Sequence, residues 1–386
     1  MDLQTFLKIY RDPGFTDYDK MSRKYPGAFD EALRELRASF YIDLPLPDLS
    51  GASLVMLRAE TGADHRSRQL LLRDNPQGYG VRTAENEIIS SARIESIDYS
   101  RDSVRDILRG RAPRDEEERR ILGMKQGLEF ICDPGNDISE ENIYHLYMTA
   151  IGRFLPPEDR PKEGAYYRDD EVFIVSDRIE HTGAPAKKLP AAMRAAAAFA
   201  ASEDDGVDPL TKGAILHFYL AWLHPYFDGN GRMARLLHLW YLLRAGYCSA
   251  LFLPFSSLIE KSRKEYYNAF TRTEKNSCYS GLIDVTPFLR YFTEKIYNRL
   301  PEDEPTTDTQ RLRALREDGK ITEKEQRLWE FVLSRYGGGE FSTKMLEKDF
   351  GDAAYATIRA FVLKFTDLEL LIAERYGSRT KYRVKF

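Results

Sequence analysis

The sequence of 386 residues has few cysteines and no long apolar run. Its three cysteines (Cys132, Cys248 and Cys278) lie far apart, are odd in number and match no metal-binding spacing. This pattern favours free thiols in a reducing compartment. The N-terminal stretch MDLQTFLKIYRDPGF lacks the apolar core of a signal peptide, and no later segment is apolar for the thickness of a bilayer. The expected location is therefore the cytoplasm, with no membrane partner.

The chain also lacks a strong excess of charge and any internal repeat. Its 57 Lys and Arg residues and 61 Asp and Glu residues give a net charge of -4. A nearly balanced charge gives no general argument for nucleic-acid binding, so such a partner would need a local basic patch. Since a single core rarely grows beyond about 250–300 residues, the length predicts two or three domains.

Helical patterns fill most of the chain, which predicts a mainly α fold. Segments with amphipathic or apolar helical spacing include YPGAFDEALRELRASF, TAENEIISSARIESIDYS, DEEERRILGMKQGLEFI, EENIYHLYMTAIGRFL, LPAAMRAAAAFAASED and DPLTKGAILHFYLAWLHPYF. The last is apolar on almost every side and is therefore expected at the centre of the fold. We expect a turn-rich break at DLPLPDLSGAS and a surface hairpin or loop in LVMLRAETGADHRSRQLLLRDNPQGYG. The clearest strand–turn–strand candidate is DEVFIVSDRIEHTGAP, with Val172, Phe173, Ile174 and Val175 before the turn.

The composition changes near residue 300. Residues 301–310 are rich in Pro, Thr and acidic side chains and predict a linker. Residues 311–386 follow the order of three helices and a terminal hairpin, which is typical of a winged helix-turn-helix. The segment ERYGSRTKYRVKF is basic, as a DNA-contacting wing would be, but the candidate recognition helix offers only Arg359 and Lys364 as cations. Both DNA binding and protein docking stay open for this region.

The segment HPYFDGNGRMAR (residues 224–235) concentrates chemically useful side chains. An apolar helix ends near Tyr226 and a new helix starts after the glycines, so Gly229, Asn230 and Gly231 lie at a helix N-terminus, which favours an anion. Arg232 and Arg235 are three residues apart on one face of the first turn. Both can reach one polyphosphate.

Two further side chains lie at the entrance of this loop. Asp228 supplies a hard oxygen suited to Mg²⁺ that bridges phosphates. His224 can take a proton from an attacking hydroxyl at neutral pH. Taken singly, a turn, a surface arginine pair and a core histidine are the commoner interpretations, and His217 and His238 are interpreted as core residues. The combination instead predicts a phosphoryl- or nucleotidyl-transfer site.

The segment resembles the signature of the Fic (Fido) family, His-Pro-Phe-x-[Asp/Glu]-Gly-Asn-Gly-Arg-x-x-Arg, with Tyr226 in place of Phe. The resemblance extends over roughly half of the chain. It implies a compact helical Fic fold and transfer of AMP from ATP to a Ser, Thr or Tyr hydroxyl of a target protein. It assigns His224 as the base, Asp228 to Mg²⁺, Asn230 and the loop backbone to the α-phosphate, and Arg232 and Arg235 to the outer phosphates. Fic proteins often dimerise, so a homodimer is a further expectation.

The same resemblance implies two more elements. Residues 172–183 correspond to the family's flap, which holds a target segment by main-chain pairing. Tyr266 and Tyr267 occupy the region of the nucleotide-base pocket, although ordinary core aromatics are an equally good interpretation. The implied domain boundaries are an N-terminal helical region at 1–110 and a catalytic core at 111–300.

A built-in inhibitory helix is the last expectation. Many Fic proteins carry the motif [Ser/Thr]-x-x-x-Glu-[Gly/Asn], and here SARIES supplies Ser91 and Glu95, with Ser96 in place of Gly or Asn. The resemblance implies a helix at about 84–98 whose Glu95 pairs with Arg235 and competes with the γ-phosphate. Other relatives transfer phosphocholine or a phosphoryl group, or remove AMP. A nucleotide-sensing DNA-binding regulator is the alternative from another class.

Overall fold

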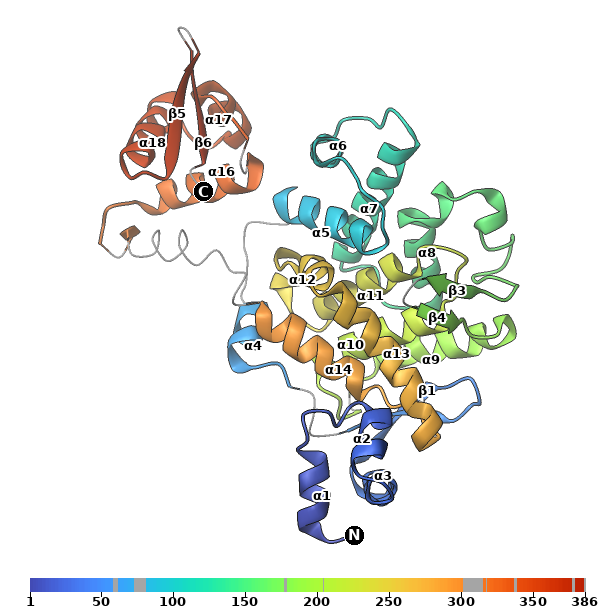
Figure 1. Cartoon of the computed structure of the whole chain (residues 1–386). Coiled ribbons are helices and arrows are strands. Elements are labelled where there is room, and N and C mark those ends of the chain that lie inside the picture. Colours follow the sequence, from blue (N-terminus) through green and yellow to red (C-terminus); the bar gives the residue numbers. More distant parts are fainter. Residues whose placement is uncertain are drawn as a thin grey trace. The chain divides into compact units, whose positions relative to one another are not determined.

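The computed structural model describes residues 1–57, 62–72, 81–176, 179–203, 205–300, 315–316, 318–336, 339–376 and 379–384 (Figure 1). The chain divides into two compact units. The large unit comprises Met1–Pro76 and Ala84–Pro301, and the C-terminal unit comprises Gln77–Thr83 and Glu302–Phe386. The predicted linker at 301–310 lies outside the described residues.

The N-terminal part of the large unit is a small helical cluster followed by a β-hairpin. Its helices are α1 (Leu3–Tyr10), α2 (Tyr18–Lys24) and α3 (Ala28–Ser39), which pack around Phe15, Tyr18 and Phe29. The strands β1 (Tyr41–Pro47) and β2 (Ser53–Leu57) then pair antiparallel. The predicted turn-rich break is confirmed at residues 48–52, which form the turn of this hairpin. It is wrong for residues 43–47, because Leu44 and Leu46 alternate with outward-facing residues and are buried as in a strand.

The next segment also corrects an expectation. Residues His65–Leu72 form helix α4 where a surface hairpin or loop was predicted, and Leu70 and Leu71 are buried on its inner face. Residues 58–61 and 73–80 of that segment lie outside the described residues. The following helix, α5 (Val81–Ile94), buries Ile88, Ile89 and Ile94 as its spacing predicted.

The other elements of the large unit are mostly helical. They are α6 (Arg101–Leu108), α7 (Glu116–Cys132), α8 (Glu140–Ala150), η1 (Gly152–Phe154), η2 (Pro157–Asp159), β3 (Phe173–Ser176), β4 (Ile179–Thr182), η3 (Ala186–Lys188), α9 (Leu189–Ala201), α10 (Pro209–Leu223), α11 (Asn230–Arg244), η4 (Cys248–Phe252), α12 (Phe255–Lys261), α13 (Arg263–Ser280), α14 (Thr286–Tyr291), the π-turn η5 (Phe292–Ile296) and η6 (Tyr297–Arg299). Of these, α7, α8, α9, α10 and α11 match predicted helical segments.

Helices α10 and α11 form the centre of this unit. Asp208 caps α10 by accepting from the N–H groups of Leu210 and Thr211, and Pro209 occupies the first turn, where its missing N–H costs nothing. Thirteen of the fifteen α10 residues are buried, as the nearly continuous apolar sequence predicted. Helix α10 packs against α9, α11 and α14, while α11 also packs against α7 (Figure 1). The loop that joins α10 to α11 is thereby held between buried helices.

The C-terminal unit has a separate apolar core. It contains α16 (Glu323–Arg335), α17 (Thr343–Phe350), α18 (Tyr355–Asp367) and the antiparallel strands β5 (Leu371–Tyr376) and β6 (Arg379–Val384). Thr322 and Glu325 form a capping box at α16. Trp329, Phe341 and Phe365 lie in the core, and Phe341 also pairs with Tyr382 of β6. The element order is the predicted one, while the winged-helix assignment stays a prediction.

Two expectations about the whole chain can be compared with the structure. All three cysteines are free and exposed, as their spacing predicted. Among the described residues, no helix combines the length and the apolar character needed to cross a bilayer.

Candidate active site

The loop between α10 and α11 begins with His224, which caps the C-terminus of α10. Its backbone is left-handed, with φ at 53°, and its N–H donates to Leu220 O. The helix ends three residues before the predicted end near Tyr226, because Pro225 has no N–H with which to continue the hydrogen-bond ladder. His224 is half-buried, and its Nδ1 lies 3.4 Å from Ala221 O.

Asn230 closes the loop with its side chain. Its Nδ2 donates to Tyr226 O at 2.8 Å, and its Oδ1 accepts from Tyr226 N at 2.9 Å. Gly229 adopts φ of 81° as the N-cap of α11, and a Cβ there would lie 2.5 Å from Ile151, so only glycine fits. The Tyr226 ring stacks on Tyr147. The amide of Asn230 thus shapes the loop, and the first turn of α11 presents its backbone N–H groups.

The two arginines of the first α11 turns are both buried and have different partners. Arg232 is 4% exposed, and its Nη2 lies 3.3 Å from the Asp228 carboxylate. Arg235 is 2% exposed, and its Nε donates to Ser91 Oγ while Nη2 donates to Ser91 O, both at 2.8 Å. Nε of Arg232 and Nη1 of Arg235 are buried without a hydrogen-bond partner. Two cations with unused donors at a helix N-terminus form a strong binding site for an anion.

Glu95 occupies this region in the structure. Its Oε1 accepts from Arg235 Nη2 at 2.8 Å, so the predicted ion pair is present. A Cβ built on Gly231 would lie 2.1 Å from the same oxygen, which places the carboxylate directly against the first turn of α11. Burial opposes the charge of Arg235, but the attraction of the Glu95 carboxylate, together with that of Tyr266 and Tyr267, leaves the pKa of Arg235 above its ordinary value.

The end of α5 explains the last position of the SARIES segment, Ser96. The helix ends at Ile94, so the predicted range of about 84–98 runs past it. Ile97 N donates to Ala92 O and Ser96 N donates to Arg93 O, which is a Schellman arrangement. Ser96 has φ of 62°, the conformation that favours Gly or Asn. Ser96 therefore keeps the geometry of that position, at a cost in strain.

Asp228 lies at the open side of the loop. Its side chain is 57% exposed, Oδ1 accepts from Gly229 N at 2.5 Å, and Oδ2 faces Arg232. Within the described residues, no group of three or more His, Cys, Asp or Glu side chains could hold a metal by itself. One carboxylate nevertheless fits Mg²⁺, because this ion commonly takes its other ligands from phosphates and water.

The remaining predicted residues lie around this centre. Tyr266 is 2% exposed and its hydroxyl bonds Nε2 of His217 at 2.8 Å, so it contributes to the core. Tyr267 donates to Ile94 O at 3.1 Å beside the end of α5. Their assignment to a base pocket stays a prediction.

The predicted hairpin is present as β3 and β4, paired from Phe173 with Thr182 to Ser176 with Ile179. Gly183 N donates to Val172 O and extends this pairing by one step. Phe173 is 71% exposed.

One buried residue next to the loop carried no sequence signal. Arg168 lies in the irregular segment before β3, is 2% exposed and donates to His224 O at 2.8 Å. No motif or spacing singled it out, because its partners are far away in the sequence.

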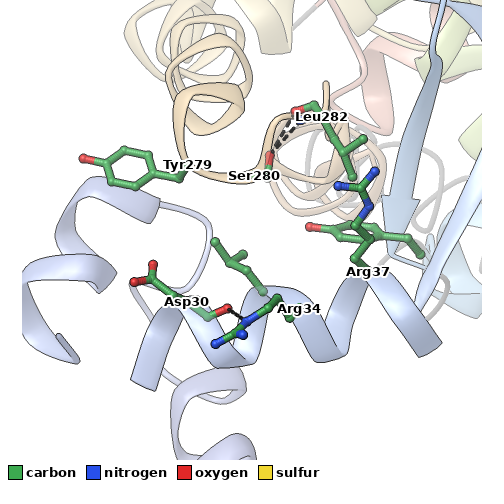
Figure 2. A pocket seen from close by; sticks show the side chains of 8 residues that line it. Asp30, Arg34, Arg37, Tyr279, Ser280 and Leu282 are labelled. Atoms are coloured by element: carbon green, nitrogen blue, oxygen red, sulfur yellow. Dashed lines mark hydrogen bonds between the residues drawn. The ribbon is translucent and has the colours of Figure 1, made fainter. Parts of the chain in front are cut away.

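A separate pocket of about 240 Å³ lies between α3 and α13. Figure 2 shows Asp30, Arg34 and Arg37 on one side and Tyr279, Ser280 and Leu282 on the other, with Arg34 Nε donating to Asp30 O. It contains none of the predicted site residues, so the α10–α11 loop remains the candidate site.

Comparison with known proteins places a family domain on this same region. Residues 137–242 match the model of the Fic/DOC family, a range that includes α8, the β3–β4 hairpin, α9, α10, the loop and most of α11. A crystal structure of a Fic family protein from Desulfovibrio desulfuricans G20 has a TM-score of 0.51 and 20% identity, and the match covers 83% of this chain and 90% of that chain. The predicted mainly α Fic fold is thereby confirmed.

Curated relatives are named protein adenylyltransferase Fic. The one from Drosophila willistoni is 26% identical over 272 residues, which covers 68% of this chain and 49% of the relative. The one from Nematostella vectensis is 27% identical over 180 residues, which covers 45% of this chain and 37% of the relative. The chain therefore spans half or less of the length of these relatives.

Proposed function

We propose that the protein is a Mg²⁺-dependent protein adenylyltransferase that moves AMP from ATP to a Ser, Thr or Tyr hydroxyl of a target protein. The observation that carries this proposal is the pair of buried, incompletely bonded arginines at the N-terminus of α11, a few residues after His224. The hydroxyl oxygen attacks the α-phosphorus, the bond to the β-phosphate oxygen breaks, and pyrophosphate leaves. The names of the curated relatives support the same activity.

Each polar group of the loop has a role in this reaction. His224 accepts the proton of the attacking hydroxyl. The N–H groups at Asn230 and Gly231 stabilise charge on the α-phosphate, as an oxyanion hole does, while the N–H of Gly229 donates to Asp228 and shapes the loop. The Asn230 side chain acts indirectly, since both of its polar atoms bond Tyr226.

The outer phosphates are assigned to Arg232 and Arg235, whose unused donors are available to phosphate oxygens. Mg²⁺ would be held by Asp228 and would neutralise charge on the phosphates. Tyr266 and Tyr267 remain the candidate neighbours of the base. The hairpin, including Val172, Phe173, Ile174 and Val175, would hold an extended target segment along its edge.

We also propose that Glu95 inhibits the enzyme. Its carboxylate accepts from Nη2 of Arg235 and repels a γ-phosphate, so ATP cannot bind productively until the α5 end moves. The position of Glu95 beside the phosphate site also favours a second activity, removal of AMP from a modified target, in which the same carboxylate orients a water.

The test compares wild type, Glu95→Gly and Glu95→Gly/His224→Ala with Mg²⁺ and ATP labelled at the α- or γ-phosphate. We expect protein-bound label from the α-position alone, strongest in Glu95→Gly and absent from the double variant. Label from the γ-position would mean phosphoryl transfer, and label from neither would contradict ATP as donor and make a phosphocholine donor the next one to test. Equal labelling of wild type and Glu95→Gly would contradict the inhibition.

The alternative of a DNA-binding regulator gains little from the C-terminal unit. Lys364 pairs with Glu325, Lys381 with Glu340 and Arg383 with Glu374, so carboxylates of the same unit neutralise these cations. Because the unit has its own core, residues 311–386 can be tested alone. Steeply salt-dependent DNA binding would support the regulator, and no binding would support protein docking or dimerisation.

A further inference from the structure

Arg168 forms a buried junction between the β3–β4 hairpin and the end of α10. Its Nε donates to His224 O at 2.8 Å, and Nη2 donates to Ala184 O at 2.5 Å and lies 3.5 Å from Leu223 O. Its Nη1 donates to Asp170 O at 2.5 Å. One guanidinium therefore joins three stretches of chain: the segment entering the hairpin, the segment leaving it and the cap of α10.

The partners of this buried cation are all backbone carbonyls. Leu223 O and His224 O are at the C-terminus of α10, where the last carbonyls lack helical partners and the helix dipole favours a cation. Burial lowers the pKa of Arg168, and no carboxylate hydrogen-bonds the guanidinium in the described structure. A planar group with five donors is needed to reach carbonyls in three directions, which a lysine cannot do.

Backbone contacts bring the same three stretches together. Arg168 N donates to Pro225 O at 3.1 Å, and Ala184 N donates to Leu223 O at 2.9 Å. Gly183 lies against both key side chains, since a Cβ there would be 2.7 Å from Arg168 Nη2 and 3.2 Å from His224 Cβ. The hairpin base and His224 are therefore positioned by one shared set of contacts.

We propose that Arg168 is a positioning residue that fixes His224 relative to the hairpin, so that a hydroxyl held by the hairpin edge meets the histidine in line with the α-phosphate. This inference rests on the proposed adenylyl transfer. The guanidinium holds the carbonyl of His224, a residue whose left-handed backbone ends α10. Because its donors are engaged with backbone carbonyls, loss of Arg168 should affect the transfer step and leave ATP binding intact.

The experiment uses the full chain in the Glu95→Gly background and compares Arg168→Lys with Arg244→Lys. Arg244 is a matched control, since its guanidinium also donates to carbonyls at a helix end, those of Ile131 in the last turn of α7 and of Pro134 just after it. We expect Arg168→Lys to lower the self-labelling rate at saturating ATP by 10- to 100-fold, on the order of the loss from a misplacement of about 1 Å. The KM for ATP should change less than twofold, and Arg244→Lys should change neither.

A rate equal to that of Arg244→Lys would overturn the proposal, and so would a parallel loss of ATP affinity. If Arg168→Lys does not fold, Gly183→Ala supplies the second test, because its added methyl group displaces Arg168 and His224 without changing any charge. This variant should also lower the labelling rate and leave the KM for ATP nearly unchanged.

Amide hydrogen exchange separates this inference from the proposed function. In Arg168→Lys, exchange should accelerate at residues 182–185 and 223–226 and stay unchanged in Arg244→Lys. If the Glu95→Gly parent gives no label at all, the adenylyl transfer is wrong, yet the exchange still decides whether Arg168 joins the two segments. Unchanged exchange would refute the coupling whatever the labelling.

Discussion

The site at the α10–α11 loop and the surface of the C-terminal unit treat their cations in opposite ways. In the large unit, Arg232 and Arg235 are almost fully buried, and each keeps one nitrogen without a hydrogen-bond partner. In the C-terminal unit, Lys364, Lys381 and Arg383 lie nearer the surface and pair with carboxylates at 2.7–2.8 Å. Buried arginines with unused hydrogen-bond donors are expected at a site that binds an anionic ligand. Surface cations that pair with carboxylates of the same unit need no ligand.

The physical basis is the cost of burial. A buried charged group that lacks a hydrogen-bond partner destabilises the fold, so such groups are expected where function requires them. Surface ion pairs contribute about 0–1 kcal/mol each, and the C-terminal unit must therefore owe its stability to its apolar core.

The largest effect is expected from Trp329→Ala in the C-terminal unit. Trp329 is fully buried against Phe365, and removing such a side chain costs about 3–5 kcal/mol. Calorimetry of the full chain should show the transition of this unit shifted down or lost, while α-ATP labelling by Glu95→Gly persists. Loss of labelling together with the C-terminal transition would show that the two units do not act separately.

The next effect is expected at Arg232. In the Glu95→Gly background, Arg232→Ala removes charged hydrogen bonds to phosphate, worth about 1.5–3 kcal/mol, and should weaken ATP binding by about 10- to 150-fold. The matched control is Arg359→Ala, an exposed arginine on α18, which should leave the affinity unchanged. Equal affinities in the two variants would remove Arg232 from the nucleotide site.

Acid stability should also differ between the units. Burial lowers the pKa of His238 to about 3 and that of His217 well below its ordinary value, so the folded large unit keeps both rings neutral. The unfolded chain binds these protons below pH 6.5, and stability therefore falls with acidification, by up to about 1.4 kcal/mol per pH unit for each ring.

The C-terminal unit provides the internal control for this dependence, because residues 302–386 contain no histidine. Thermal unfolding between pH 7 and pH 5 should lower the transition of the large unit and leave the other nearly constant. His238→Gln should reduce the slope of the large unit by about half. An unchanged slope would mean that His238 is protonated in the folded state.

The sequence predicted the parts of the site that depend on local order. The glycines, His224 and the arginines form one continuous segment, and a helix that ends at Leu223, before Pro225, and a new helix after Gly229 fix their placement. The Glu95–Arg235 pair was predicted only from the family resemblance. The two residues are 140 positions apart, and such a separation gives no indication that they are in contact.

The parts that the sequence did not predict depend on tertiary contacts. Arg168 gains its partners only when the hairpin base packs on the end of α10, and the Asn230 amide turns toward Tyr226 because the loop closes on itself. The β1–β2 hairpin was missed for a different reason. Its Pro45 and Pro47 predicted a turn, yet prolines are tolerated on an edge strand. The alternation of buried Leu44 and Leu46 with exposed residues was the pattern that indicated a strand.

The smallest effect is expected where the inhibitory motif departs from its family pattern. Ser96 has a left-handed backbone, which costs a non-glycine residue about 1 kcal/mol, while its hydroxyl accepts one exposed bond from Arg263. Ser96→Gly should therefore stabilise the end of α5 by about 0.5–1 kcal/mol. Because Glu95 precedes this turn, the same change should reduce the residual self-labelling of wild type by two- to fivefold. Increased labelling would show instead that strain at Ser96 holds Glu95 against Arg235, rather than promoting its release.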